Sequence, residues 1–389
     1  MRYFWGLDLI RFLSAVLVVL FHVYAFGGET PIWPADANIA PLSWLQPVAW
    51  MGWIGVQIFF VISGFVIAAS AQASLAGTFL KKRAIRLLPA LWISASLALL
   101  ARALWGEPVG ELLPSFLRTL VLAPKGPYID GVVWTLVVEA AFYLSTAVVI
   151  FFSASFGGNE RALYRFALLL GATSAAFTVF YWAVETMQNV PIAGAIVPYV
   201  NSFVFDITLF RQGVFFALGM LLYQVVNRGM ARQDMLLIFA LSLACALQIF
   251  NNVGALIPAL KPIAIWAIAT GLIYSGALYG DRLIKRDLRP IMRPVGLMTY
   301  PLYLNHFILG QALLPILATR ITNSAVLFLV LFSILLANAW LIAQYPERWV
   351  QKKLRQTLLG GAGGLRSARP PAAGPLIARP SMGDERSLP

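Results

Sequence analysis

The stretch from Leu9 to Phe26 reads LIRFLSAVLVVLFHVYAF. It is apolar enough to cross a bilayer as a helix, which takes about 20 residues, and yet it contains Arg11 and His22. A charged side chain at the centre of a membrane helix costs about 2.5–3.5 kcal/mol on insertion scales. An arginine and a histidine in such a helix therefore indicate that one of its faces is turned away from lipid.

The composition of the whole chain indicates a membrane protein with many spans. Of its 389 residues, 60% are hydrophobic and only 12% are charged, which is too few charges for a water-soluble domain of this size. The net charge of +13 could suggest nucleic acid, but the basic residues gather in short segments between apolar runs, so we expect no nucleic-acid partner. One cysteine and two histidines are too few for a disulfide framework or a His-rich metal centre.

The apolar runs predict an all-α polytopic fold with about ten transmembrane helices, because backbone polar groups in lipid must be satisfied within their own segment. A cleaved signal peptide is the alternative for the N-terminal run, but Arg11 in its apolar core argues against cleavage. The predicted spans are 7–26, 50–70, 87–105, 132–152, 163–183, 207–226, 234–251, 262–280, 295–317 and 324–345.

The basic residues predict that both termini lie in the cytoplasm (N-in and C-in). In this orientation most of the 29 Lys and Arg residues fall on the cytoplasmic side, and the external loops 27–49 and 184–206 contain neither. Residues 1–350 are predicted to form one transmembrane domain. Residues 351–389, which end in a stretch rich in Gly, Pro, Ala and Arg, are predicted to be a disordered cytoplasmic tail.

Arg11 and His22 project from one face of the first predicted helix. They are eleven residues apart, which is close to three full turns or about 16 Å along the helix axis, and Asp8 lies about one turn before Arg11. One interpretation is structural, with Arg11 paired to Asp8 and His22 capped by a carbonyl. The other is a polar stripe that lines a cavity across much of the membrane, since ionisable residues within spans usually face such cavities.

A second charge lies in GVVWTLVVEAAFYL, where Glu139 is about seven residues from the outer end of its span. This places Glu139 near the expected depth of His22. A carboxylate that faces a histidine can orient the imidazole and raise its basicity, as in a general-base dyad. The alternative is a glutamate that snorkels or pairs with another polar group.

A basic cluster precedes the third span in KKRAIRLLPALW, Lys81–Trp92. It is explained either as a cytoplasmic anchor or as a phosphate site. The phosphate site is favoured by Arg83 and Arg86, which share a helical face, because a guanidinium group binds phosphate bidentately. Lys82 adds a further cation to the same segment.

Two more stretches contain candidate residues. TYPLYLNHF places Tyr303 and His306 near the middle of the ninth span, although a lone histidine among aromatic residues is more often a core residue than a catalyst. IFFVISGFVIA contains Ser63 and Gly64, a small-residue notch whose commonest use is close helix packing.

Taken together and in order, these stretches resemble the acyltransferase-3 family of bacterial integral-membrane acyltransferases. The resemblance runs from about residue 5 to 350, and the ordered set of motifs is more specific than any single one. The motifs are LDLIRFLSAVLVVLFH with Asp8, Arg11 and His22, FFVISGF at 59–65, RAIRLLPALW at 83–92, WTLVVEAAFY at 134–143 with Trp134, Glu139 and Tyr143, YPLYLNHF at 300–307 and YPERW at 345–349.

The resemblance implies transfer of an acyl group, usually acetyl, from cytoplasmic acyl-CoA to a sugar hydroxyl of a surface or secreted glycan or glycoside. Acyl-CoA is then a co-substrate, and we expect no tightly bound cofactor, no metal and no C-terminal extracytoplasmic domain of the kind that some relatives carry. The implied location is the bacterial inner membrane. The resemblance places His22 at the proposed catalytic position of the family, and it places Arg11, Arg83 and Arg86 at positions implicated in acyl-CoA handling.

We therefore predict a central channel through which the thioester reaches the outer half of the membrane. There His22, assisted by Glu139, would remove the proton of the acceptor hydroxyl, and a covalent acyl-histidine is the alternative. We predict that Lys82 binds acyl-CoA together with the arginines. The residues predicted to line the cavity or the acceptor side are Asp8, Ser63, Trp134, Tyr143, Tyr303 and His306.

The main rival function is a transporter or flippase for a polar or lipid-linked glycan. Its intramembrane charges would form a substrate or proton pathway, and it predicts inverted repeats and helices broken at the midplane, which the sequence does not clearly contain. A sensor or scaffold is a third alternative, but it gives no reason for so many motifs.

Overall fold

The structure is a computed structural model that describes residues 4–24, 32–33, 42–283 and 289–360. All regular secondary structure in these ranges is helical, which confirms the all-α polytopic fold. Ten helices coincide with the predicted spans, and they are α1 (Trp5–Tyr24), α3 (Ile54–Ala71), α4 (Ala76–Leu104), α6 (Trp134–Phe151), α7 (Asn159–Thr186), α10 (Gly213–Arg228), α11 (Arg232–Val253), α12 (Leu256–Leu283), α13 (Arg289–Ala318) and α14 (Ser324–Gln344).

Within the described residues, nine helices are long and apolar enough to cross a membrane. Of the ten helices that match predicted spans, α10 is the exception, because its 16 residues reach only about 24 Å. Most of its residues are buried, since it packs against α3, α7 and α11. The predicted span 207–226 therefore corresponds to a short helix held inside the bundle.

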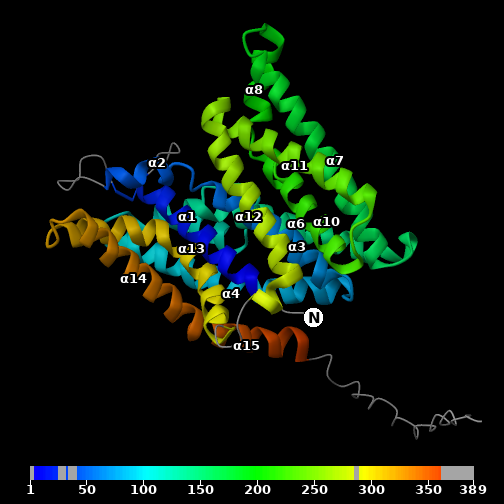
Figure 1. The fold of residues 1–389 in the computed structure, drawn as a ribbon. Helices are drawn as coiled ribbons and strands as arrows, with labels where there is room; N and C mark the ends of the chain where they lie inside the picture. The colour runs from blue at the N-terminus through cyan, green and yellow to red at the C-terminus, as the bar shows by residue number, and fades with distance from the viewer. Residues whose placement is uncertain (1–3, 25–31, 34–41, 284–288, 361–389) are drawn as a thin grey trace, which may run out of the picture.

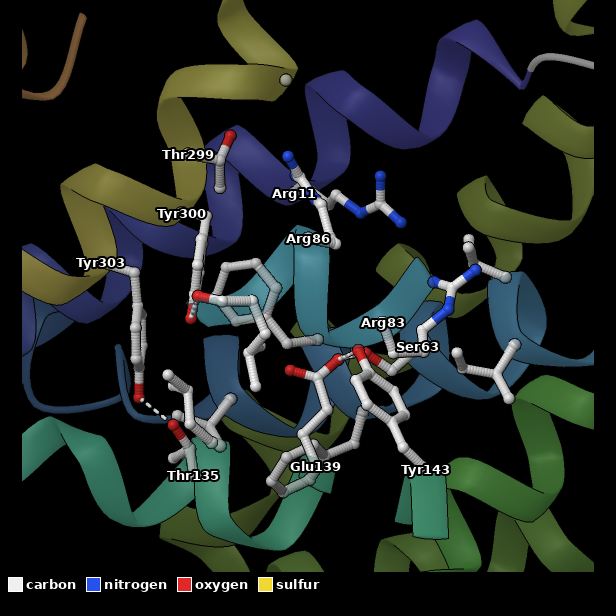
Figure 2. A pocket seen from close by; sticks show the side chains of 18 of the residues that line it. Arg11, Ser63, Arg83, Arg86, Thr135, Glu139, Tyr143, Thr299, Tyr300 and Tyr303 are labelled. Atoms are coloured by element: carbon white, nitrogen blue, oxygen red, sulfur yellow. Dashed lines mark hydrogen bonds between the residues drawn. The ribbon is translucent and has the colours of Figure 1, made fainter. Parts of the chain in front are cut away.

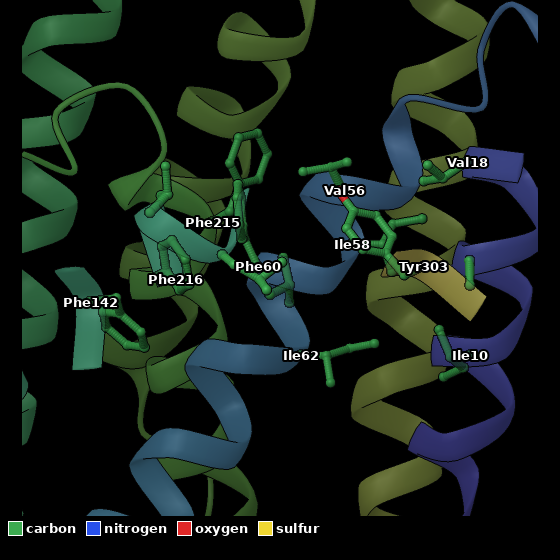
Figure 3. Close-up of a cluster of buried hydrophobic side chains, with 14 of the residues drawn as sticks. Ile10, Val18, Val56, Ile58, Phe60, Ile62, Phe142, Phe215, Phe216 and Tyr303 are labelled. Carbon is green, nitrogen blue, oxygen red and sulfur yellow. The ribbon is translucent and has the colours of Figure 1, made fainter. Parts of the chain in front are cut away.

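The most extensive helix contact joins α3 and α10, and it depends on two glycines. A Cβ atom on Gly64 would overlap the carbonyl oxygen of Phe216, and a Cβ atom on Gly219 would overlap that of Val61. The small-residue notch at Gly64 thus serves the close helix packing expected of it. Aromatic rings fill the space beside this contact, where Phe142 and Phe216 stack with ring centroids 4.3 Å apart (Figure 3).

Helix α1 lies against α3, α12 and α13 (Figure 1). Gly52 and Gly55 allow α3 to come close, because a Cβ atom on either glycine would overlap a backbone carbonyl oxygen of α1. Helix α13 in turn contacts α1, α4 and α14. The polar residues of α1, α4 and α13 can therefore meet inside the bundle rather than in lipid.

Shorter helices lie outside the predicted spans. Helix α8 (Pro191–Val200) extends together with α7 and α11 beyond the rest of the bundle at one end (Figure 1). Helix α15 (Pro346–Leu359) packs against α4 and α14 and crosses the predicted domain boundary at residue 350, so the expected tail begins as helix, and residues 361–389 lie outside the described residues. These shorter helices are α2 (Gln46–Ala49), α5 (Val109–Leu120), α8 (Pro191–Val200), α9 (Val204–Ile207) and α15 (Pro346–Leu359).

Replacing Gly219 by Ala should destabilise the protein by about 1–3 kcal/mol, the usual cost of forcing extra atoms into a packed core. The added methyl group would meet the carbonyl oxygen of Val61 in the neighbouring helix. The measurement is thermal unfolding of the purified protein in detergent. Gly271→Ala is the matched control, because Gly271 also lies within a helix and has nothing within 4 Å of the added methyl group. Equal melting temperatures for the two variants would contradict the packing role of Gly219.

Candidate active site

Helices α1, α3, α4, α6 and α13 enclose a cavity of about 420 Å³ (Figure 2). Five segments far apart in the sequence supply its polar lining. The predicted site residues that line it are Asp8, Arg11, Ser63, Lys82, Arg83, Arg86, Glu139, Tyr143 and Tyr303. Other polar lining residues are Thr135, Thr299 and Tyr300.

Four cations line this cavity, and they come from two helices. Arg11 is in the first half of α1, and the other three, all in the first half of α4, are Lys82, Arg83 and Arg86. Lys82 is exposed and the side chain of Arg86 is 39% exposed, so the cavity is accessible from the surface at this end. Among the described residues two carboxylates, Asp8 and Glu139, belong to the same lining, which leaves an excess of positive charge suited to an anionic ligand.

Neighbouring side chains hold the α4 arginines in place. The guanidinium carbon of Arg83 lies 5.5 Å from the ring centroid of Phe79 and 5.9 Å from that of Tyr143, within the range of cation–π attraction. Arg86 Nη1 lies 3.8 Å from Oε1 of Glu347, a buried residue of α15. The helix that follows the last predicted span therefore helps to position a cation of the cavity.

Glu139 is the acceptor of two short hydrogen bonds inside the cavity. The hydroxyl groups of Ser63 and Tyr143 both donate to its Oε1 atom, each at 2.6 Å (Figure 2). Ser63 belongs to α3, whereas Tyr143 follows Glu139 by one turn of α6. Hydrogen bonds to a carboxylate are about twice as strong as neutral ones, so this network fixes the contact between α3 and α6.

Asp8 and Arg11 form an ion pair on one face of α1. Arg11 Nη1 donates to Asp8 Oδ1 at 3.3 Å, as the structural interpretation of this stretch predicts. Gly296 of α13 makes room for the carboxylate, because a Cβ atom there would lie 2.6 Å from Asp8 Oδ1. The pair still lines the cavity, so the structural and cavity interpretations both apply to these two residues.

Tyr303 lies at the boundary between this cavity and the two histidines. Its hydroxyl group is 2.9 Å from Thr135 Oγ1, and its ring packs edge-on against Phe59 with centroids 5.7 Å apart. Its ring centroid is 5.9 Å from that of His306, one turn further along α13. Tyr303, Thr135 and Phe59 line the cavity, whereas neither histidine does, so the cavity stops short of the histidine pair.

The two histidines of the chain are hydrogen-bonded to each other. His306 Nε2 lies 3.1 Å from His22 Nδ1, and the ring centroids are 4.9 Å apart. His22 Nδ1 is also 3.0 Å from the carbonyl oxygen of Val18, which matches the predicted capping by a carbonyl. His306 is fully buried, and the ring of Phe307 packs 5.0 Å from that of His22.

Two predicted features differ from the structure. The expected dyad of His22 and Glu139 is not found, because the hydrogen bonds described above join Glu139 to Ser63 and Tyr143. Depth along the axis suggested the dyad, but the rotation of each helix about its axis decides which side chains meet. The cavity also does not reach His22 as the expected channel would, because Tyr303 lines it and neither histidine does.

Like His22 and His306, Trp134 is a predicted site residue that does not line the cavity. Its ring packs instead against Phe203, with centroids 6.4 Å apart and the planes nearly perpendicular. Its neighbour Thr135 takes part in the site, and the sequence contains a signal for it, since Thr135 precedes Glu139 by one helical turn. No group of His, Cys, Asp and Glu within the described part of the chain could hold a metal ion.

Comparison with known proteins agrees with the resemblance. A family model described as an acyltransferase domain matches residues 4–344. Nodulation protein 10 of Rhizobium leguminosarum bv. viciae is 33% identical over 114 residues, which cover 23% of this chain and 31% of that protein. The chain thus matches less than a third of the length of this relative. No solved structure gives a significant match.

Because the family model matches most of the chain, this protein belongs to the acyltransferase-3 family. With its many apolar helices, it is a multi-pass membrane protein of that family.

Ser63→Ala and Tyr143→Phe should each destabilise the protein by about 1.5–3 kcal/mol, the usual value of a hydrogen bond to a charged group. Both hydroxyl groups bond to the same carboxylate oxygen, so the effects of the two changes should not add in the double variant. Thermal unfolding in detergent measures this coupling. Ser145→Ala is the matched control on α6, because its hydroxyl group donates only within the helix, to the carbonyl of Ala141. Additive effects would show that the two bonds form independently.

Proposed function

We propose that this protein transfers an acyl group, most simply acetyl, from acyl-CoA to a hydroxyl of a sugar in a surface or secreted glycan or glycoside. The observation that carries the proposal is the cavity, in which four cations lie toward the open end and the closed end stops one helical turn short of a histidine pair. Family membership favours this reaction over transport of a glycan.

The donor is proposed from the charge of the cavity. Coenzyme A carries several phosphate charges, and a guanidinium group can bind phosphate bidentately. Arg83 and Arg86 lie one turn apart on α4 and both line the cavity, with Lys82 beside them. The basic residues favour an orientation in which the N-terminus lies on the cytoplasmic side of a bacterial inner membrane. In this orientation the open end of the cavity faces the cytoplasm, which is the compartment that contains acyl-CoA.

The path of the acyl group is proposed from the length of α1. Arg11 and His22 are separated by about 16 Å along the helix axis, which the long pantetheine arm of coenzyme A can bridge. The thioester would then reach the closed end of the cavity, against Tyr303 and Thr135. In the proposed reaction the side chain of Tyr303 leaves Thr135, and this movement lets the acyl group pass toward His22.

His22 is proposed as the general base. Its imidazole takes the proton of the acceptor hydroxyl as the oxygen attacks the thioester carbon, and the carbon–sulfur bond then breaks. The proton passes from the imidazole to the leaving thiolate, so that free CoA and the acylated sugar are the products. A sugar hydroxyl is the acceptor that the family resemblance implies, and it would arrive from the outer side.

Glu139 acts on the donor side in this proposal. It keeps Ser63 and Tyr143 in fixed positions on the wall of the cavity. Tyr143 in turn packs against the guanidinium group of Arg83. The carboxylate therefore shapes the surface along which the donor lies, and the assistance to His22 comes from another residue.

Arg83→Ala combined with Arg86→Ala should weaken acetyl-CoA binding by at least about 100-fold. Each lost hydrogen bond to a charged group costs about 1.5–3 kcal/mol, and every 1.4 kcal/mol is tenfold. The measurement is the Kd for acetyl-CoA with purified protein in nanodiscs. The control is the double variant Arg161→Ala and Arg165→Ala, which removes the same charge from exposed positions outside the cavity. An equal loss of binding in the control would reduce the role of the α4 arginines to general surface charge.

His22→Ala should lower acyl transfer by about 10²–10⁴-fold, the usual contribution of a general base, while acetyl-CoA binding is kept. The assay measures CoA release from acetyl-CoA with the glycan fraction of the producing cells, deacylated by mild alkali, as acceptor. Mass spectrometry of the product glycan detects the acyl increment. Leu13→Ala is the control on the exposed face of α1. A wild-type protein that binds glycan but never consumes acyl-CoA would overturn the proposed function.

A further inference from the structure

The hydrogen bonds around His306 define where its proton lies. His306 Nδ1 is 2.7 Å from the carbonyl oxygen of Tyr303. A carbonyl oxygen only accepts hydrogen bonds, so His306 Nδ1 must carry a hydrogen and donate it. In a neutral imidazole the other nitrogen then has a lone pair, so His306 Nε2 is an acceptor.

The same reasoning extends to His22, because two acceptors converge on one of its nitrogens. His22 Nδ1 lies 3.1 Å from His306 Nε2 and 3.0 Å from the carbonyl oxygen of Val18. A hydrogen on His22 Nδ1 satisfies both contacts as a shared donor. If His306 were instead doubly protonated, the lone pair of His22 Nδ1 would face the Val18 carbonyl oxygen, and the two would repel each other. The lone pair of a neutral His22 is therefore on Nε2.

We propose that His306 is a positioning residue that holds His22 with its proton on Nδ1, so that Nε2 is the nitrogen that accepts the proton of the acceptor hydroxyl. This inference rests on the proposed function for its catalytic meaning. His306 does for His22 what a carboxylate does in other base–orienter pairs, but it does so as a neutral group.

A neutral orienter suits the surroundings of the pair. His306 is fully buried, and the rings of Phe21 and Phe307 pack at 5.2 and 5.0 Å from that of His22. An ionised carboxylate in such an environment would need its own charged partner. When His22 Nε2 takes a proton during transfer, the Nδ1 hydrogen stays bonded to His306 Nε2 and the Val18 carbonyl, so no other proton has to move.

Tyr303 connects the pair to the closed end of the cavity. Its backbone carbonyl accepts the hydrogen of His306 Nδ1, while its side chain hydroxyl contacts Thr135. The side chain can therefore leave Thr135 without breaking the bond that orients His306. The orientation of the base is thus independent of the movement that the proposed donor path requires.

The first test reads the tautomers directly by ¹⁵N NMR. The chain contains two histidines, so protein labelled with ¹⁵N-histidine and purified without a histidine tag has four ring nitrogen signals from them. We expect two protonated Nδ1 and two unprotonated Nε2 signals, which is the less common tautomer of imidazole in water. His306→Gln, which leaves one histidine, assigns the signals. A hydrogen on His22 Nε2 in the wild-type protein would overturn the inference, whatever the reaction is.

The second test compares two substitutions of the orienter. In His306→Gln the amide oxygen can occupy the place of Nε2 and accept from His22 Nδ1, whereas His306→Leu has a similar volume and no acceptor. We expect kcat to fall about 10–100-fold in the leucine variant, the usual cost of losing an orienting partner, with the Kd for acetyl-CoA unchanged. The glutamine variant should keep more of kcat than the leucine variant.

The two proposals fail in different ways. Full activity of His306→Leu, or an equal loss in both variants, overturns the positioning role while the acyltransferase assignment stands. A wild-type protein that releases no CoA with any deacylated glycan fraction overturns the proposed function, and the NMR result still decides the tautomer. If the leucine variant does not fold, as judged by thermal unfolding, the NMR measurement on the wild-type protein remains the deciding one.

Discussion

The structure depends on one constraint, which is that the polar face of α1 must be enclosed by other helices. A charged side chain exposed to hydrocarbon is energetically costly. Its hydrogen-bond partners, whether backbone or side-chain groups, therefore have to come from the protein. Helix α1 meets this requirement with three other helices around it. The ion pair of Asp8 and Arg11 lines the cavity, where Gly296 makes room for the carboxylate. The histidine of α1, His22, lies against His306 of α13.

The close approach of backbones makes this enclosure possible. Without a hydrophobic force between helices in lipid, association depends on van der Waals packing and hydrogen bonds, which small residues favour. Glycines supply close approach at the contacts of α3 with α1 and α10, and at four positions the facing atom is a backbone carbonyl oxygen that cannot move aside. The polar site is therefore built on tightly packed helix pairs, and the hydrogen bonds of Glu139 then join α3 to α6 across the cavity.

Much of this arrangement could be predicted from the sequence, and the reason is the same constraint. An ionisable residue in an apolar run is costly to expose to lipid, so it is expected on the face of its helix that points into the bundle. Arg11, Glu139 and the histidines therefore identified the interior faces of their helices. The partners on the same helix could be predicted, as for Arg11 with Asp8, but the partners on other helices could not, because the sequence gives the depth of a residue and not the rotation of its helix. Glu139 and His22 lie at similar expected depths and yet bond to different groups. The pairing of the two histidines joins residues 284 positions apart, and only their shared position inside apolar spans hinted at it.

The closed end of the cavity has a consequence for the proposed reaction. A thioester that reached a basic histidine together with water would be hydrolysed, and an open passage lined by charges would also let ions cross the membrane. Tyr303 contacts Thr135 and Phe59 at the wall of the cationic cavity, and neither histidine lines that cavity. Excluding water strengthens the electrostatic interactions inside a site and prevents side reactions. In the proposed scheme, the donor and the base are therefore kept apart until the acyl group itself occupies the passage. The hydrogen bond from His306 to the Tyr303 backbone keeps the base oriented during that movement.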